Sequence, residues 1–188
     1  WIGETLGRLP NLYFPVRARY YYERWSGVAI NFAGAMWAMY PPLFASATHQ
    51  AFDRYSLDLL ISLCRDGPGH LIGIHPEGGR NRGPDPYSFR KLQPGTWRII
   101  HAARPQVIPV FIAGLTNSLP HHIAATWRGG EPIRLHFGPA VDLSRFFALP
   151  PKGSTYKTIT EFVMEQVRML AEHDRVVSVG SVDPCSLS

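Results

Sequence analysis

The sequence predicts an α/β protein with a mixed β-sheet flanked by helices. Short apolar runs alternate along the chain with longer stretches that have the spacing of helices. The chain of 188 residues is 45% hydrophobic and 18% charged, which is typical of a globular protein and not of a disordered one. We expect a single domain over residues 1–175 and a disordered tail over residues 176–188.

Four apolar segments are expected to form strands. The first is rich in β-forming residues, the second is a short buried run, and the fourth alternates in polarity. The third contains Pro109, and a proline inside a strand needs a sheet edge or a bulge because it cannot donate a hydrogen bond. The four segments are Val16–Tyr22, Leu71–His75, Val107–Ile112 and Ile133–Phe137.

Four further segments have the pattern of helices. The first has the length and small-residue content of a packed helix, and the second shows one apolar face before a Gly-Pro-Gly sequence. The last carries an apolar stripe, and Thr158 with Glu161 resembles a capping box near its start. The four segments are Gly27–Tyr40, Ser56–Arg65, Gly95–Ala103 and Thr155–Glu172.

Composition excludes several classes of protein. The two cysteines are too few for a disulfide-dense secreted scaffold or a multi-cysteine zinc module, and they favour a reducing cytoplasm. The longest uncharged stretch, Trp25–Phe52, is broken by Pro41 and Pro42, so a transmembrane helix is not expected. The net charge of +5 fits nucleic acid, an anionic membrane or an acidic substrate. Because no run of five basic residues occurs, we do not expect a nucleic-acid partner.

The segment His75–Arg82 carries the chemistry that the sequence offers. Glu77 and Arg80 flank two glycines directly after an expected strand. Glycine permits positive φ, the freed backbone amides of such a turn can hold an anion, and arginine offers a planar fork suited to phosphate. The alternative is an ordinary surface turn with a solvated Glu–Arg pair. The basic pair Arg90-Lys91 downstream favours the phosphate interpretation.

These residues resemble the conserved motifs of a known enzyme family. Pro76-Glu77-Gly78-Gly79-Arg80 is similar to the third motif of the glycerolipid acyltransferases, the lysophosphatidate acyltransferase-like proteins, which reads Phe-Pro-Glu-Gly-Thr-Arg-Ser. Phe89 to Gly95 resembles the phenylalanine, basic residue and glycine that follow it, and Ile108-Pro109-Val110 resembles the fourth motif. Phe52-Asp53-Arg54 resembles the second motif. His75, Gly79 and Asn81 depart from the third motif, which leaves its glutamate and arginine intact.

The resemblance implies a glycerol-3-phosphate acyltransferase-like fold and a role in phospholipid biosynthesis at the cytoplasmic membrane surface. The enzyme would transfer an acyl group from acyl-CoA or acyl-carrier protein to a hydroxyl of a lysophospholipid, with lysophosphatidate as the expected acceptor. Neither a metal nor a bound cofactor is implied. The substrate-binding residues would be Arg54, Glu77, Gly78, Gly79 and Arg80, supported by His75, Pro76, Arg90, Lys91, Ile108, Pro109 and Val110.

The family's catalytic pair, a histidine and an aspartate separated by four residues, has no counterpart at the matching place in this chain. We therefore expect that pair upstream of Trp1, so no catalytic residue is assigned here. The alternative is a protein with an acyltransferase fold that binds lipid or phospholipid without catalysis.

Two other features leave alternatives open. The apolar stretch Val28–Phe44 fits core packing, the wall of an acyl-chain groove, or a membrane-facing surface, since tryptophan and tyrosine favour the bilayer interface. His121 and His122 could bind a metal, but adjacent side chains diverge, which favours a surface loop.

Overall fold

The computed structural model of the chain describes residues 11–17, 22, 24–33, 40–43, 50–66, 69–78, 83, 85–93, 95–115, 128–129 and 132–180. Contacts within the chain divide it into two compact units. Unit 1 comprises residues 1–76 and 95–105, and unit 2 comprises residues 77–94 and 106–188. The single domain that we expect over residues 1–175 stays a prediction.

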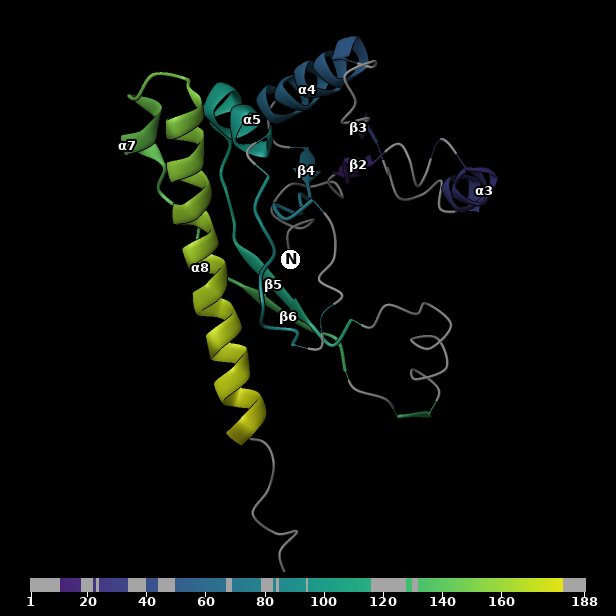
Figure 1. The fold of residues 1–188 in the computed structure, drawn as a ribbon, viewed down its shortest axis with the longest axis vertical. Helices are drawn as coiled ribbons and strands as arrows, with labels where there is room; N and C mark the ends of the chain where they lie inside the picture. The colour runs from purple at the N-terminus through teal and green to yellow at the C-terminus, as the bar shows by residue number, and fades with distance from the viewer. Residues whose placement is uncertain are drawn as a thin grey trace, which may run out of the picture. The chain divides into compact units, whose positions relative to one another are not determined.

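The described part of unit 1 contains short parallel strand pairs and three helices (Figure 1). Pro15 separates its first two strands and cannot donate to a ladder, which helps to keep these pairs short. β1 (Asn11–Tyr13) pairs with β4 (His70–Ile72), and β2 (Val16–Arg17) pairs with β3 (Pro42–Leu43). The helices are α3 (Trp25–Ala33), α4 (Gln50–Arg65) and α5 (Gly95–Ala103).

The core of unit 1 forms where α4 packs against α5. Leu60 of α4 is fully buried, as are Trp97 and Ile99 of α5 apart from a few per cent of their surface. The Arg65 guanidinium donates a 2.7 Å hydrogen bond through Nη2 to the carbonyl of Ala102, which satisfies one of the carbonyls left free at the end of α5. These contacts join two helices that lie far apart in the sequence.

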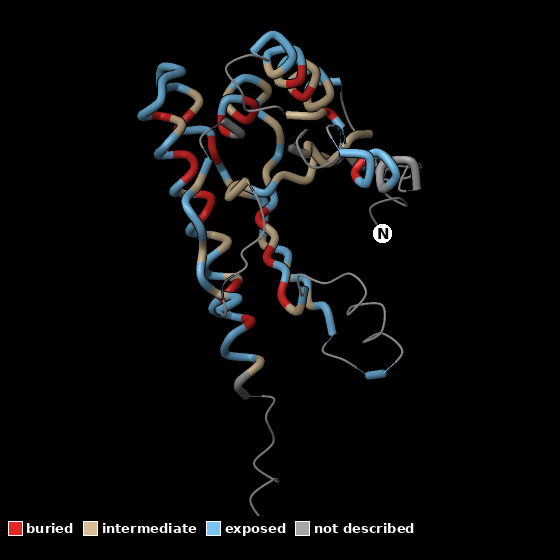
Figure 2. Tube along the Cα trace, turned by 45° about the vertical axis from the view of Figure 1, so that its right-hand side comes forward, coloured by how far each residue is buried: buried red, intermediate tan, exposed pale blue. Residues whose placement is uncertain are grey.

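The described part of unit 2 is an antiparallel strand pair packed on a long helix. β5 (Val110–Ala113) pairs with β6 (Arg134–Phe137), and both strands contact α8 (Gly153–Gly180). The short helix α7 (Ser144–Phe147) precedes α8. Figure 2 shows buried residues recurring along α8, as expected for a helix with one apolar stripe.

The two faces of the β5–β6 pair differ in an unusual way. Phe111 and Ala113 lie opposite His136 and Arg134, and residues directly opposite each other share a face of the ladder. Phe111 and Ala113 pack against Ala171 of α8, so the covered face carries two polar side chains from β6. The other face is apolar and partly exposed; it carries Val110, Ile112, Leu135 and Phe137.

The expected α/β class is confirmed, but the single mixed sheet is not found among the described residues. Their strands form two parallel pairs and one antiparallel pair, each with only two strands. Strands of two to four residues with prolines beside or within them offer few donors for a wider sheet.

The helix boundaries were predicted with mixed success. α5 begins and ends at the expected residues, whereas α4 begins six residues before Ser56. The capping box is wrong, because α8 begins at Gly153 and the Thr158 hydroxyl lies inside it, donating to the carbonyl of Ser154. α8 also continues past Glu172 to Gly180, so residues 176–180 are helical and not part of a tail.

The remaining expectations fall partly outside the described residues. Of the expected strand Val16–Tyr22, only Val16–Arg17 is a strand, and Tyr22 lies in a turn. The expected helix at Gly27–Tyr40 is confirmed up to Ala33, while residues 34–39 lie outside the described part. His121 and His122 also lie outside it. None of the described helices is long and apolar enough to span a bilayer.

Candidate phosphate-binding site

The loop that follows β4 turns where the glycines predicted it would. Pro76 and Glu77 form a turn, and Gly78 adopts a φ of 66°, which an L side chain rarely tolerates. The positive φ expected of this glycine pair is thus confirmed at its first member. Gly79 and Arg80 lie outside the described residues, so their roles stay predictions.

A hydrogen bond joins Glu77 to the basic pair Arg90-Lys91 downstream. Its Oε1 accepts a 3.0 Å hydrogen bond from the backbone N–H of Arg90, thirteen residues later. The turn that resembles the third motif is therefore joined to the segment that resembles the residues after it. The side chain of Glu77 is half-buried, whereas Arg90 and Lys91 are exposed.

A tight turn shapes the segment before Arg90. The Asp85 carboxylate accepts a 3.0 Å hydrogen bond from the N–H of Tyr87, which is the pattern of an aspartate turn. The Ser88 hydroxyl donates to the carbonyl of Asp85 at 3.0 Å. The ring of Phe89 then packs against Phe111 of β5, with 6.4 Å between the ring centroids. We call Asp85–Arg90 the anchored segment.

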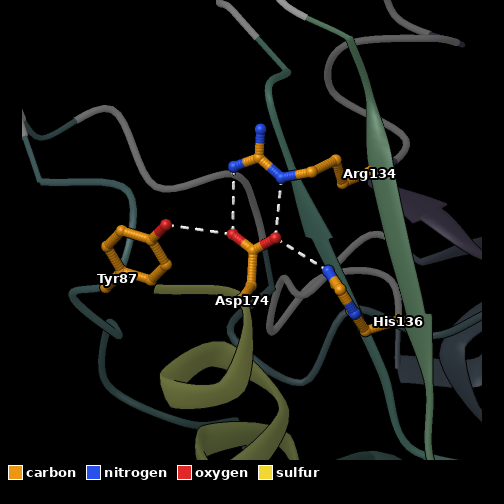
Figure 3. A network of polar contacts seen from close by, with 4 residues as sticks. All are labelled: Tyr87, Arg134, His136 and Asp174. Carbon is orange, nitrogen blue, oxygen red and sulfur yellow. Dashed lines mark hydrogen bonds and ion pairs between the residues drawn. The ribbon is translucent and has the colours of Figure 1, made fainter. Parts of the chain in front are cut away.

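Asp174 of α8 is the centre of a buried polar network that the sequence did not predict (Figure 3). Its side chain is fully buried. The Arg134 guanidinium binds both carboxylate oxygens, at 2.7 Å and 3.1 Å, and the Tyr87 hydroxyl donates at 2.9 Å. His136 lies 2.7 Å away through Nε2. Since an ionised carboxylate has no proton to donate, His136 carries its proton on Nε2.

The network keeps Asp174 ionised. The hydrogen bond from Arg134 lowers the pKa of the Asp174 carboxyl well below its ordinary value, and the hydrogen bonds from His136 and Tyr87 add to this effect. Burial acts in the opposite direction and is outweighed. The same contact raises the pKa of the Arg134 guanidinium. The inward-facing polar residues of β6 thus compensate one buried carboxylate on α8.

We expect unit 2 to lose stability in acid because of this carboxylate. A lowered folded-state pKa contributes stability that is fully present above the unfolded-state pKa of about 3.9 and is lost as pH falls through the folded-state value. Between about pH 6 and about pH 3, the wild-type chain should therefore lose more stability than Asp174→Asn, which has no such proton to take up. Urea unfolding at both pH values measures the difference, and equal losses would contradict the expectation.

Pro109 lies at a bulge beside this network. It is buried, and its carbonyl accepts a 3.0 Å hydrogen bond from Gly138. Val107 pairs with Val141 in an antiparallel bridge. One residue lies between Val107 and Pro109, but two lie between their partners Val141 and Gly138, so the register of the ladder shifts by one residue here. The expectation of a sheet edge or a bulge applied to a proline inside a strand, whereas Pro109 precedes β5, which starts only at Val110; the extra residue lies on the facing segment, between Gly138 and Val141.

The other predicted residues are placed as follows. Ile108 is exposed beside Pro109, and Val110 pairs with Phe137. Arg54 is exposed on α4 in unit 1, as is His75 after β4, with Pro76 half-buried. Glu77, Arg90 and Lys91 belong to unit 2. The assignment of Arg54 to the same substrate-binding site as Glu77 therefore stays a prediction.

A shallow hollow lies between the anchored segment and α8. It has a volume of about 430 Å³, and Tyr87, Phe89 and Met169 are among the residues that line it. Across its rim, Arg168 and Glu165 form a 2.9 Å ion pair. No group of metal-ligating side chains occurs among the residues that the structure describes.

No family model, curated protein or solved structure matches the chain. The resemblance to the glycerolipid acyltransferases therefore stays a prediction.

Proposed function

We propose that the chain belongs to an acyltransferase that moves an acyl group from an acyl thioester to a hydroxyl of a phosphate-bearing glycerolipid, with lysophosphatidate as the acceptor. The observation that carries the proposal is the hydrogen bond from the Arg90 N–H to Glu77. It joins two segments that resemble one family's neighbouring motifs, and it gathers basic side chains beside a glycine turn.

In this proposal the phosphate lies between the glycine turn and the basic residues. Gly78 leaves its backbone open to a ligand, and Arg80 forms paired hydrogen bonds with the phosphate oxygens. Arg90 and Lys91, both exposed, add positive charge beside the turn. Glu77 does not bind the phosphate, because like charges repel; it holds the two segments together.

The transfer itself needs a base that this chain is not expected to supply. The acceptor oxygen attacks the thioester carbonyl, the base takes the hydroxyl proton, and the thiol of acyl-CoA or acyl-carrier protein leaves with the proton that it requires. By resemblance, the base would be the histidine of the family's catalytic pair, which has no counterpart at the matching place in this chain. The acceptor is a lipid, so the proposal includes peripheral association with the cytoplasmic face of a membrane.

Two substitutions at Glu77 test the proposal. Glu77→Ala removes the acceptor of the Arg90 hydrogen bond, whereas Glu77→Gln keeps an acceptor oxygen and removes only the charge. We expect Glu77→Ala to weaken lysophosphatidate binding about 3- to 10-fold, the value of one ordinary hydrogen bond. Glu77→Gln should bind as tightly as the wild-type chain or more tightly, because a repulsive charge is gone. Titration calorimetry measures both affinities.

The matched ligand is the monoacylglycerol with the same acyl chain, which lacks the phosphate. Neither substitution should change its affinity. If the wild-type chain bound both lipids equally, the phosphate-binding role would be wrong. If it bound lysophosphatidate and the complete protein still failed to acylate it, the non-catalytic lipid-binding alternative would replace the enzyme.

A further inference from the structure

The side chain of Asp174 is held in place by its partners and contacts the anchored segment. Its carboxylate is fully buried and is held by two residues of β6, Arg134 and His136, through contacts of 2.7 to 3.1 Å. A buried carboxylate with this many partners cannot move without leaving charged groups unpaired, which costs free energy. The third partner, Tyr87, is the only one of the three that belongs to the anchored segment.

Tyr87 contacts three other residues of unit 2. Its hydroxyl donates to Asp174 at 2.9 Å, and its ring stacks on Phe111 with 5.9 Å between centroids and an interplanar angle of 21°. The guanidinium carbon of Arg175 lies 5.8 Å from the ring centroid. Arg175 follows Asp174 directly on α8, so the tyrosine is held by the helix and by β5 together.

Little chain separates this tyrosine from the residue that binds Glu77. Only Ser88 and Phe89 lie between Tyr87 and Arg90, and three residues of extended chain span at most about 11 Å. Phe89 also packs against Phe111, and this contact further restricts the short link between Tyr87 and Arg90. The position of Tyr87 therefore restricts where the Arg90 N–H can lie.

We propose that the hydrogen bond from Tyr87 to Asp174 fixes Arg90 and Lys91 relative to Glu77, which makes Tyr87 and Asp174 positioning residues for the phosphate site. This inference rests on the proposed function for its consequence in binding. The structural part of the proposal, that the hydrogen bond immobilises the anchored segment, does not depend on any ligand.

Backbone order parameters from ¹⁵N relaxation test the structural half. In the wild-type chain, the amides of residues 87–90 should be rigid, with order parameters near about 0.85. Tyr87→Ala removes the hydroxyl and the ring, and should lower these values below about 0.6. Tyr87→Phe keeps the stacked ring and should give intermediate values. The amides of β5 should keep their wild-type values in both variants.

Thr155→Val is the matched control. It removes one partly buried hydroxyl hydrogen bond, 2.8 Å to the carbonyl of Pro150, at the other end of α8. Nineteen residues of helix separate Thr155 from Asp174, about 28 Å along the axis, so the anchored segment should stay rigid. Unchanged order parameters at residues 87–90 in Tyr87→Phe would overturn the proposal, because that variant removes the hydrogen bond and keeps the ring; an equal loss of order in the control would overturn it too.

Binding of glycerol 3-phosphate tests the consequence for the site. Its affinity should fall about tenfold in Tyr87→Ala and remain unchanged in Thr155→Val. If the segment loosened but the affinity stayed the same, the positioning role would be refuted. If the wild-type chain did not bind glycerol 3-phosphate at all, the proposed function would fail, while the order parameters would still decide whether Tyr87 anchors the segment.

Discussion

Asp174→Ala should destabilise unit 2 by about 3 kcal/mol. The substitution leaves the Arg134 guanidinium and the His136 imidazole without the buried carboxylate that they share. Removing one member of a buried ion pair typically costs about 3–5 kcal/mol, and the side chain of Arg134 is 33% exposed, so water can compensate part of the loss. Urea unfolding followed by far-UV circular dichroism, to which the 28-residue α8 contributes, measures the change.

Asp142→Ala is the control for this substitution. Asp142 is exposed, and its carboxylate accepts hydrogen bonds from the backbone N–H and the hydroxyl of Ser144. It should change the unfolding free energy much less. Equal effects of the two substitutions would mean that the Asp174 network contributes no more than a surface turn.

Arg80→Ala should weaken binding of lysophosphatidate about 10- to 100-fold, because a charge-assisted hydrogen bond contributes about 1.5–3 kcal/mol. The affinity for the matching monoacylglycerol should stay unchanged, since the lost contact is made only with phosphate. Titration of both lipids against the wild-type chain and the variant measures the ratio of the two losses.

A general loss of positive charge could also weaken the binding of lysophosphatidate, so a control for charge is needed. Lys157→Ala removes one charge from the exposed start of α8, where the lysine pairs loosely with Glu161 at 3.8 Å. This control should leave the binding of both lipids almost unchanged. If Arg80→Ala weakened both lipids to the same degree, Arg80 would not bind the phosphate.

Local sequence signals predicted the elements whose boundaries are set locally. α5 begins and ends as expected because Gly95 and Pro105 mark its limits and its apolar residues repeat with helical spacing. Gly78 has the positive φ expected at a glycine pair after a strand. Pro109, which cannot donate to a ladder, lies just before β5 and opposite a one-residue shift in register.

The Asp174 network depends on tertiary packing and was missed for that reason. Asp174 lies one helical turn beyond Leu170 and Ala171, on the stripe that packs against β5. An acidic residue at such a position indicates a buried partner, but the helix was expected to end at Glu172. Alternation in β6 predicted two faces, yet nothing local indicated that Arg134 and His136 would lie on the covered one.

The candidate site was predicted in part. Glu77 and Arg90 come from segments that the sequence singled out, and the structure joins them. Tyr87 was not singled out, because its role depends on a residue of α8 that lies 87 positions away in the chain. Arg54 was assigned by resemblance alone.

The central claim is that the Glu77–Arg90 region binds phosphate, and amide chemical shifts test it most directly. The ¹⁵N-labelled chain is titrated with glycerol 3-phosphate and, separately, with glycerol. We expect saturable shifts at the amides of Gly78 and Arg90 with glycerol 3-phosphate and none with glycerol. Shifts of equal size with both compounds, or saturable shifts only in the helices of unit 1, would contradict it.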